Sequence, residues 1–428
     1  MKRQLLILFT LVCASLTLHA NPLTLTVKPE KSYLYTTTKN CLFQIEVTAK
    51  PSLLKRTNPI DLVVVLDRSG SMEGAKLEKA KQAAAVALDQ LEEQDTYSLV
   101  VYDDKVDTLV SRKGIKDKEQ ILSAIHAIRS GGGTGLYAGV KQGASLITET
   151  PDSNRIRRVI LLSDGLANVG PSKPDDLAQL GKELRANGIA VSTVGVGDDY
   201  NEDLMTALAE SSHANYYYVQ NAEKLPEIFA HELGDVKNIV AKNLKIQIIL
   251  PEGVKPKGIL GEPCFVFHGQ TLEIPIAEFY GAQSRRFLVE CEIPSGETQT
   301  ITVGNVEVSF SDAVTGSKKQ LSAAASVQRT KDKATEEKSA APDIVNQTAI
   351  TQNRISKEQA VKLADEGHKD KAIAVIEQQQ TLNANAPASI RASLVEDSKN
   401  TLGKMNVWSR ASRKSVQYEN YQDKYQKR

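Results

Sequence analysis

The sequence predicts an α/β domain with a doubly wound, mainly parallel sheet, flanked by a β-sandwich-like domain and followed by a C-terminal helical segment. Three observations favour this fold class. Residues 59–240 alternate short apolar runs with helix-length stretches, a pattern typical of parallel strands and crossover helices. Residues 21–58 and 241–330 alternate apolar and polar positions, which indicates strands. Residues 346–428 contain apolar residues at helical spacing.

The first twenty residues, MKRQLLILFTLVCASLTLHA, have the pattern of a secretory signal peptide. A basic start at Lys2 and Arg3 precedes an apolar run from Leu5 to Cys13, and a small residue, Ala20, ends the segment. The run is too short for a stable membrane span, and it lacks the small residue expected before a lipidated cysteine. We therefore expect cleavage after Ala20, no transmembrane span in the mature chain, and a secreted, periplasmic or cell-envelope location.

The composition is that of an ordinary globular protein of two or three domains, with 428 residues, 41% of them hydrophobic and 25% charged. Its 53 basic and 52 acidic residues nearly cancel, so the chain as a whole has no electrostatic reason to bind nucleic acid or an acidic membrane. Any partner must be recognised by a local site, and nothing in the sequence predicts the oligomeric state.

The central stretch contains the elements of the α/β domain in order. Strands are expected at LVVVLD, YSLVVYD, VDTLVS, RVILLSD, IAVSTVGVG and NYYYV. Helices are expected near residues 74–93, 117–129, 175–187, 202–212 and 222–240. The basic run RIRR at 155–158 leads straight into a strand, so we interpret it as a solvated loop rather than a basic binding patch.

The two flanks contain the stretches LFQIEV, TLEIPIAEF, RRFLVECEI and NVEVSF, and we expect them to pack as a pair of sheets. The charged, alanine-rich residues 331–345 read as a linker. Beyond them, the apolar spacing predicts an antiparallel helix pair broken near Gly367, similar to a single tetratricopeptide-type hairpin, and a further helix over 388–405. The last residues, SVQYENYQDKYQKR, are predicted to form a loosely ordered polar tail.

Three cysteines remain after removal of the signal peptide, in a chain expected to reach an oxidising compartment: Cys41, Cys264 and Cys291. One disulfide and one free thiol is the simplest arrangement. Cys41 and Cys291 each lie on the apolar face of an alternating stretch. If both flanks belong to one sandwich, these two sulfur atoms face the same core, and we expect them to pair. The alternative, Cys264 with Cys291, remains open.

Oxygen-bearing side chains gather where the apolar strands of the central domain end. Asp67 ends the first strand in LDRSGSM, and Ser69 and Ser71 follow in the next loop. Thr134 follows three glycines at the expected start of a helix, and Asp164 follows a second buried strand in VILLSDG. Because function in parallel α/β sheets gathers beyond the carboxyl ends of the strands, we expect these side chains to lie together. An all-oxygen set without His or Cys favours Mg²⁺ or Mn²⁺.

The charge of these five residues also predicts whether a bound ion can attract a further ligand. Two carboxylates only neutralise a divalent cation, so a bound ion can still attract an external anion, and part of its octahedral shell is left to water or a partner. An alternative is that Asp67 or Ser71 only caps the following helix. Capping would account for one of the five residues but not for the presence of the whole set. A phosphate cradle at GGGTG lacks the GKS or GKT that a P-loop requires.

The elements LDRSGSM, GGTGL and SDG, in this order and at this spacing, resemble the metal-ion-dependent adhesion site (MIDAS) of von Willebrand factor type A (vWA) domains. The resemblance covers residues 60–240 and implies a doubly wound, Rossmann-like fold. A looser resemblance extends to secreted bacterial vWA proteins and to the core of inter-alpha-trypsin inhibitor heavy chains.

The resemblance implies that Ser69, Ser71 and Thr134 coordinate the metal directly or nearly so, while Asp67 and Asp164 act directly or through water. Family members with a complete site bind a protein partner whose Asp or Glu fills the open metal position. The expected function is therefore noncatalytic, metal-dependent protein binding in adhesion or envelope assembly. Two alternatives remain open: a metal-assisted hydrolase, which needs a general base beside the ion, and an envelope scaffold in which the metal only stabilises the fold.

Overall fold

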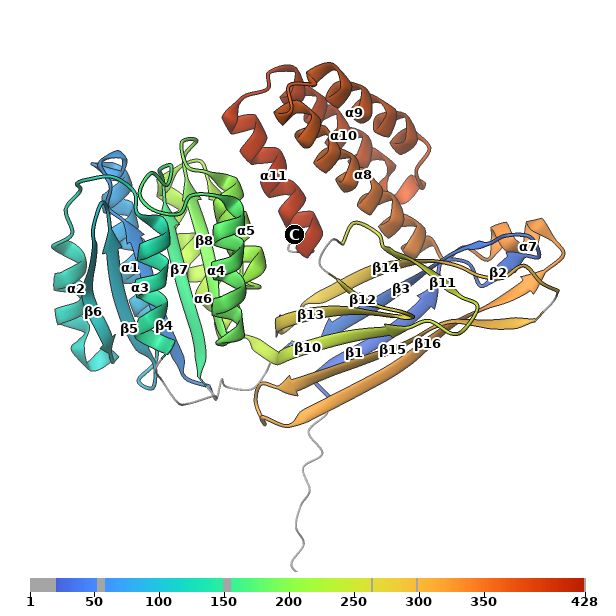
Figure 1. The fold of residues 1–428 in the computed structure, drawn as a ribbon, viewed down its shortest axis with the longest axis horizontal. Coiled ribbons are helices and arrows are strands. Elements are labelled where there is room, and N and C mark those ends of the chain that lie inside the picture. Colours follow the sequence, from blue (N-terminus) through green and yellow to red (C-terminus); the bar gives the residue numbers. More distant parts are fainter. Residues whose placement is uncertain (1–20, 52–57, 149–154, 263–264, 298, 427–428) are drawn as a thin grey trace, which may run out of the picture.

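The computed structural model describes residues 21–51, 58–148, 155–262, 265–297 and 299–426. Three units are visible in Figure 1: an α/β domain on the left, a β-sandwich and a C-terminal group of helices. We call the α/β domain the central domain because it lies between the two flanks in the sequence. The proposed signal peptide and Cys264 lie outside the described residues. None of the described helices combines the length and hydropathy needed to cross a bilayer.

The central domain is built on a six-stranded sheet in the order β6-β5-β4-β7-β8-β9. All neighbouring strands are parallel except β6, which pairs antiparallel with β5. The strands are β4 Ile60–Asp67, β5 Thr96–Tyr102, β6 Val106–Lys113, β7 Ile156–Ser163, β8 Ile189–Val196 and β9 Tyr216–Val219. From β4, the chain adds β5 and β6 on one side and then returns to add β7, β8 and β9 on the other. The strand order therefore reverses between β4 and β7, where ligand sites of such sheets lie.

Helices cover both faces of this sheet. They are α1 Ala75–Asp89, α2 Lys118–His126, α3 Leu136–Thr148, α4 Pro174–Ala186, α5 Glu202–Ser211 and α6 Leu225–Lys237. Every residue of β4 is buried, because its side chains alternate between two apolar layers. Leu62 and Val64 pack with α1, α2 and α6, whereas Val63 and Val65 pack with α3, α4 and α5. This arrangement confirms the predicted fold class of the central domain.

The two flanks form one sandwich, into which the central domain is inserted. One sheet has the order β1-β3-β14-β11 and the other β12-β13-β10-β15-β16-β2. β3, from before the central domain, pairs antiparallel with β14, from after it. The strands are β1 Leu23–Pro29, β2 Tyr33–Tyr35, β3 Asn40–Ala49, β10 Ile239–Ile249, β11 Lys255–Ile259, β12 Val266–His268, β13 Thr271–Tyr280, β14 Ser284–Glu292, β15 Thr300–Asp312 and β16 Lys318–Thr330.

The run 155–158 is not the solvated loop that we expected. Arg158 lies in β7 and is fully buried, where it forms ion pairs with Glu232 of α6 and Glu278 of β13. An unpaired charge at this depth would be strongly unfavourable. Arg158 therefore joins the central domain to the sandwich through two carboxylates that the sequence places far away.

The predicted linker 331–345 is largely helical. Asp332 accepts hydrogen bonds from the backbone N–H groups of Ala334 and Thr335, and this cap starts α7 (Lys333–Lys338). The following helices are α8 Pro342–Asp365, α9 Lys369–Ala384, α10 Ala388–Asn406 and α11 Arg410–Tyr425. The break near Gly367 occurs as predicted, with a φ of 82° that suits glycine.

The predicted polar tail is instead helix α11, which packs against the central domain (Figure 1). Lys414 is almost fully buried and donates a hydrogen bond of 2.8 Å to the carbonyl of Tyr200. The hydroxyl of Tyr421 accepts from the backbone N–H of Tyr216 at 3.1 Å and donates to the carbonyl of Ala214 at 2.9 Å. The prediction was wrong because the polar residues of this helix are satisfied by partners from the central domain.

We expect Tyr421→Phe to destabilise the docked helix by about 1–3 kcal/mol, because the change leaves buried backbone groups of Ala214 and Tyr216 without their partner. Urea unfolding followed by the fluorescence of Trp408, the only tryptophan in the sequence, measures this loss. Tyr418→Phe is the matched control, since Tyr418 is only partly buried on the same helix. Equal stability of the Tyr421→Phe variant and the native protein would contradict this account of how α11 docks.

Candidate metal site

The five predicted site residues meet at one edge of the central sheet. Asp67 is the last residue of β4, and Asp164 directly follows β7. These two strands are parallel neighbours at the point where the strand order reverses. In open α/β sheets, ligands bind beyond the carboxyl ends of the strands at such a reversal point.

Backbone contacts hold the first two loops against each other. The backbone N–H of Ser69 donates to Asp67 Oδ1 at 2.8 Å, and a 3₁₀ turn, η1 (Gly70–Met72), follows. Met72 is fully buried in the core of the domain and anchors this turn. The N–H of Gly70 donates to the carbonyl of Gly132 at 3.2 Å. The serine loop and the glycine loop that carries Thr134 therefore contact each other and form one rim of the site.

Short distances join the side chains across this rim. The Ser69 and Ser71 hydroxyl oxygens are 3.1 Å apart, and the Ser71 hydroxyl donates to Asp164 Oδ1 at 2.6 Å. A Cβ placed on Gly165 would lie 3.1 Å from Thr134 Oγ1, 3.4 Å from Ser71 Oγ and 3.9 Å from Ser69 Oγ. The three hydroxyls thus converge on the face of Gly165, which has no side chain of its own.

Both carboxylates are buried. Asp67 and Asp164 have no exposed surface, Ser69 and Thr134 have almost none, and Ser71 is exposed. Burial raises the pKa of Asp67, and hydrogen bonds from Ser69 and from Ser163, whose hydroxyl lies 2.7 Å from Asp67 Oδ2, oppose the rise. The charge of Asp164 raises the pKa further. Two buried carboxylates this close together favour a cation, and the exposed side of the site is at Ser71.

Lys76 is a site residue that the sequence analysis missed. Its ammonium group donates to Asp164 Oδ2 at 2.6 Å, and the side chain is about one-third exposed at 36%. Lys76 lies in the first turn of α1, and a lysine at a helix start carries no sequence signal of such a contact. The ammonium group supplies a positive charge at the carboxylate that a metal would also use.

Two further residues position the glycine loop. Asp104 accepts a hydrogen bond from the N–H of Gly133 at 2.8 Å, and Asn168 accepts one from the N–H of Thr134, also at 2.8 Å. The sequence analysis missed both residues. Asn168 lies three residues after the SDG element, and this closeness is the sequence feature that could have identified it as part of the site.

The donor set fits a small, hard cation. Two carboxylates and three hydroxyls offer only oxygen atoms, which Mg²⁺ and Mn²⁺ prefer. Among the described residues, no group of three or more His, Cys, Asp or Glu side chains forms an alternative metal cluster. A metal held here would depend on the serine and threonine hydroxyls and on water or a partner for the rest of its ligands.

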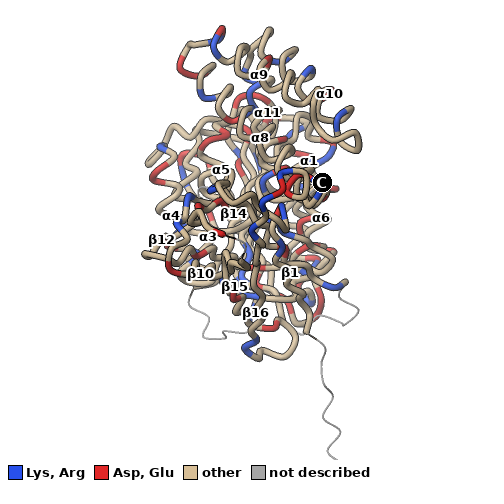
Figure 2. Tube along the Cα trace, turned by 90° about the vertical axis from the view of Figure 1, so that its right-hand side faces the viewer, with Lys and Arg blue, Asp and Glu red and all other residues tan. Residues whose placement is uncertain are grey.

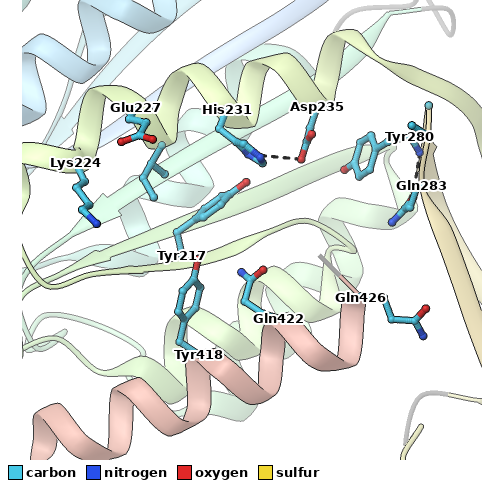
Figure 3. Close-up of a pocket in the computed structure, with 13 residues that line it drawn as sticks. Tyr217, Lys224, Glu227, His231, Asp235, Tyr280, Gln283, Tyr418, Gln422 and Gln426 are labelled. Atoms are coloured by element: carbon cyan, nitrogen blue, oxygen red, sulfur yellow. Dashed lines mark hydrogen bonds and ion pairs between the residues drawn. The ribbon is translucent and has the colours of Figure 1, made fainter. Parts of the chain in front are cut away.

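A cavity of about 480 Å³ lies elsewhere, and its described lining includes none of the five predicted residues. Figure 3 shows it between α6, the turn after β13 and α11. On its α6 wall, His231 Nδ1 lies 3.8 Å from Asp235 Oδ2. At the turn, the N–H of Tyr280 donates to the side chain of Gln283 at 3.1 Å. This cavity therefore lies at the junction of the three units and is separate from the predicted metal site.

Comparison with known proteins supports the fold and the family resemblance. A family model described as von Willebrand factor type A domain matches residues 61–231. The chain is 26% identical over 288 residues to the uncharacterized protein sll0103 of Synechocystis sp., covering 65% of this chain and 68% of that protein. It is also 26% identical over 163 residues to human inter-alpha-trypsin inhibitor heavy chain H3, covering 36% of this chain and only 18% of that protein.

A solved structure, described as von Willebrand factor type A from Catenulispora acidiphila, is similar over nearly the whole chain. It aligns with a TM-score of 0.72 and 17% sequence identity, over 90% of this chain and 89% of the other. Since the identity is low, this likeness concerns the fold. It extends beyond the central domain to the sandwich and the helices.

Proposed function

Because this chain contains a von Willebrand factor type A domain, we propose that it is a noncatalytic, metal-dependent protein-binding module. In this proposal, Asp67, Ser69, Ser71, Thr134 and Asp164 hold Mg²⁺ or Mn²⁺, and an Asp or Glu of a protein partner completes the site. The convergence of these five side chains at the reversal point of the sheet is the observation that carries the proposal. The signal-like N-terminal segment supports a role outside the cytoplasm, in adhesion or envelope assembly.

The exposure of the site supports recognition of an external carboxylate. The bound ion would supply an electrophilic position that attracts a carboxylate oxygen. The buried carboxylates of Asp67 and Asp164 balance two positive charges and no more. Ser71 is exposed, so a partner can approach from its side. The overall net charge of +1 adds no general attraction, and Figure 2 shows Lys and Arg interspersed with Asp and Glu along the chain.

The roles of the two carboxylates in the proposed site favour binding over hydrolysis. A hydrolase needs a base that can take a proton from water. In the proposed site, Asp67 and Asp164 would both already serve the metal, directly or through its waters. Assays for phosphoesterase and peptidase activity with Mg²⁺ present test this alternative, and metal-dependent turnover would overturn the noncatalytic proposal.

Affinity capture from the native cell envelope tests the binding proposal. The tagged protein is expected to retain a partner in Mg²⁺ and to release it in EDTA, and Asp67→Asn should retain none in either buffer. A partner that is held equally in EDTA would contradict a metal bridge. If no partner depends on the metal although the protein binds Mg²⁺, the scaffold alternative replaces the adhesion proposal.

We expect Lys76→Met to bind Mg²⁺ several-fold more tightly than the native protein. The ammonium group of Lys76 must give up its contact with Asp164 when a metal arrives, and methionine removes this competitor. The partial exposure of Lys76 limits the gain to about 1 kcal/mol. Isothermal titration with MgCl₂ measures the difference. Lys79→Met is the control, because Lys79 is on the same helix but pairs with Glu223. Weaker or unchanged affinity in Lys76→Met would contradict this competition.

A further inference from the structure

Two exposed apolar side chains of the central domain lie on the loop that contains the SDG element and follows β7. Leu166 is 52% exposed and Val169 is 37% exposed. Single exposed apolar residues are common on protein surfaces and need no explanation. These two differ because they lie three residues apart on one short loop that belongs to the candidate metal site. We call Leu166 and Val169 the apolar pair.

Backbone contacts place the apolar pair beside the hydroxyls of the site. Leu166 directly follows Gly165, so the Cα atoms of these two residues are about 3.8 Å apart, and the three hydroxyls converge on Gly165. The N–H of Val169 donates to the carbonyl of Thr134 at 3.3 Å. Ala167 packs against the core of the domain, whereas the apolar pair stays exposed. A partner that reaches the site therefore meets these two side chains.

A second loop that borders the site has a different chemistry. Residues 103–107, at the turn between β5 and β6, have the sequence DDKVD. Asp104 of this turn is exposed and accepts from the N–H of Gly133 at 2.8 Å. Arg68 pairs with the other two aspartates of the turn, and the turn remains net negative with this cation counted. A second carboxylate of a partner is therefore disfavoured near this turn.

We propose that the partner presents one acidic side chain with a large apolar neighbour, and that this neighbour packs on Leu166 and Val169. The inference rests on the proposed function, because the acidic side chain is the one that completes the metal site. In an extended segment, side chains two positions apart lie on the same face, about 7 Å from each other. An apolar residue two positions from the acid can thus contact the apolar pair while the acid contacts the ion.

This arrangement separates the two contributions to recognition. The ion selects a carboxylate, and burial of apolar surface on Leu166 and Val169 selects its neighbour. The acidic turn disfavours a partner with a run of acidic residues. The expected partner is therefore a segment with one acid among apolar and uncharged residues.

Surface plasmon resonance with immobilised peptides tests the inference, and calorimetry with MgCl₂ tests metal binding separately. The probes are capped heptapeptides of serine with a central glutamate. One has leucine two positions to either side of the glutamate, a second has aspartate at these positions, and a third has only serine there. In a fourth, glutamine replaces the glutamate of the leucine peptide.

In Mg²⁺, the leucine peptide should bind the full mature chain roughly fivefold or more tightly than the serine peptide, because it buries apolar surface. The aspartate peptide should bind more weakly than the serine peptide. The glutamine peptide should not bind, and no peptide should bind in EDTA.

The variants Leu166→Ser and Val169→Ser should each lower the affinity for the leucine peptide by roughly threefold or more. Both should keep native affinity for Mg²⁺ and for the serine peptide. Leu109→Ser is the matched control, since Leu109 is 38% exposed on β6 and lies outside both loops. This variant should bind all four peptides as the native protein does.

The outcomes distinguish this inference from the proposed function. Equal affinity for the leucine and serine peptides in Mg²⁺, or a native preference for leucine in both Leu166→Ser and Val169→Ser, would overturn the inference and leave the proposed function standing. A protein that binds Mg²⁺ but no peptide would overturn the inference and the adhesion proposal together. Absence of Mg²⁺ binding in calorimetry would remove the metal site on which both depend.

Discussion

Asp67→Asn is expected to weaken Mg²⁺ binding by roughly 100-fold while the domain remains folded. Asparagine keeps an oxygen that can accept from the N–H of Ser69, and the hydroxyl of Ser163 can rotate to accept from the new amide. The substitution removes one of only two negative charges near the metal. It also removes the repulsion between Asp67 and Asp164, so the metal-free domain should lose little stability. Titration calorimetry and thermal unfolding, each with and without Mg²⁺, measure these effects.

The matched control is Asp107→Asn. Asp107 is half-exposed and pairs with Arg68 in the neighbouring loop, so the change removes an acidic charge close to the site without removing a proposed ligand. It should bind Mg²⁺ nearly as the native protein does. Native affinity in Asp67→Asn would exclude Asp67 from the site, and equal losses in both variants would indicate only a general effect of charge.

Oxidation of the folded protein is expected to join Cys41 to Cys291. The two residues are directly opposite each other on the antiparallel strands β3 and β14. Both side chains are buried, both are free thiols in the structure, and Cys291 Sγ lies 3.6 Å from the carbonyl of Cys41. The disulfide would close a loop of 250 residues and raise the free energy of unfolding by about 3–5 kcal/mol.

Peptide mapping under nonreducing conditions identifies the bond, and urea unfolding with and without reductant measures its effect. The adjacent thiol of Cys291 and burial raise the pKa of Cys41, so the reactive thiolate is scarce and oxidation without a catalyst should be slow. Cys264→Ser is the control and should leave the Cys41–Cys291 peptide pair intact. A crosslink between Cys264 and Cys291, with Cys41 unmodified, would contradict the prediction.

The C-terminal helices show where local sequence was insufficient. Residues 331–345 and the last residues of the chain are polar, and polarity predicted a linker and a loose tail. In the structure, Arg413 of α11 forms ion pairs with Glu202 and Asp203 of α5 and with Asp365 of α8. No local pattern shows that these carboxylates lie nearby, because they are brought together only when α11 packs on the central domain.

More of the candidate site than of the C-terminal helices could be predicted from the sequence. Its five oxygen-bearing residues follow strand ends, and strand ends of a parallel sheet meet at one edge, so their convergence followed from the strand assignment alone. Lys76 and Asp104 were not predictable in this way. Each contacts the site through a side chain whose direction depends on packing: the ammonium group of Lys76 reaches Asp164, and the carboxylate of Asp104 holds the glycine loop.

By itself, the sequence determined the class of each unit, because burial on both faces requires continuous apolar strands and burial on one face requires alternation. It also determined which oxygen-bearing residues end the strands. Only the tertiary structure decided that β3 pairs with β14 across an inserted domain, that Arg158 is buried between two carboxylates, and that α11 is ordered. These features depend on contacts between residues that are distant in the chain, and the free energy of such contacts exists only once the units have packed together.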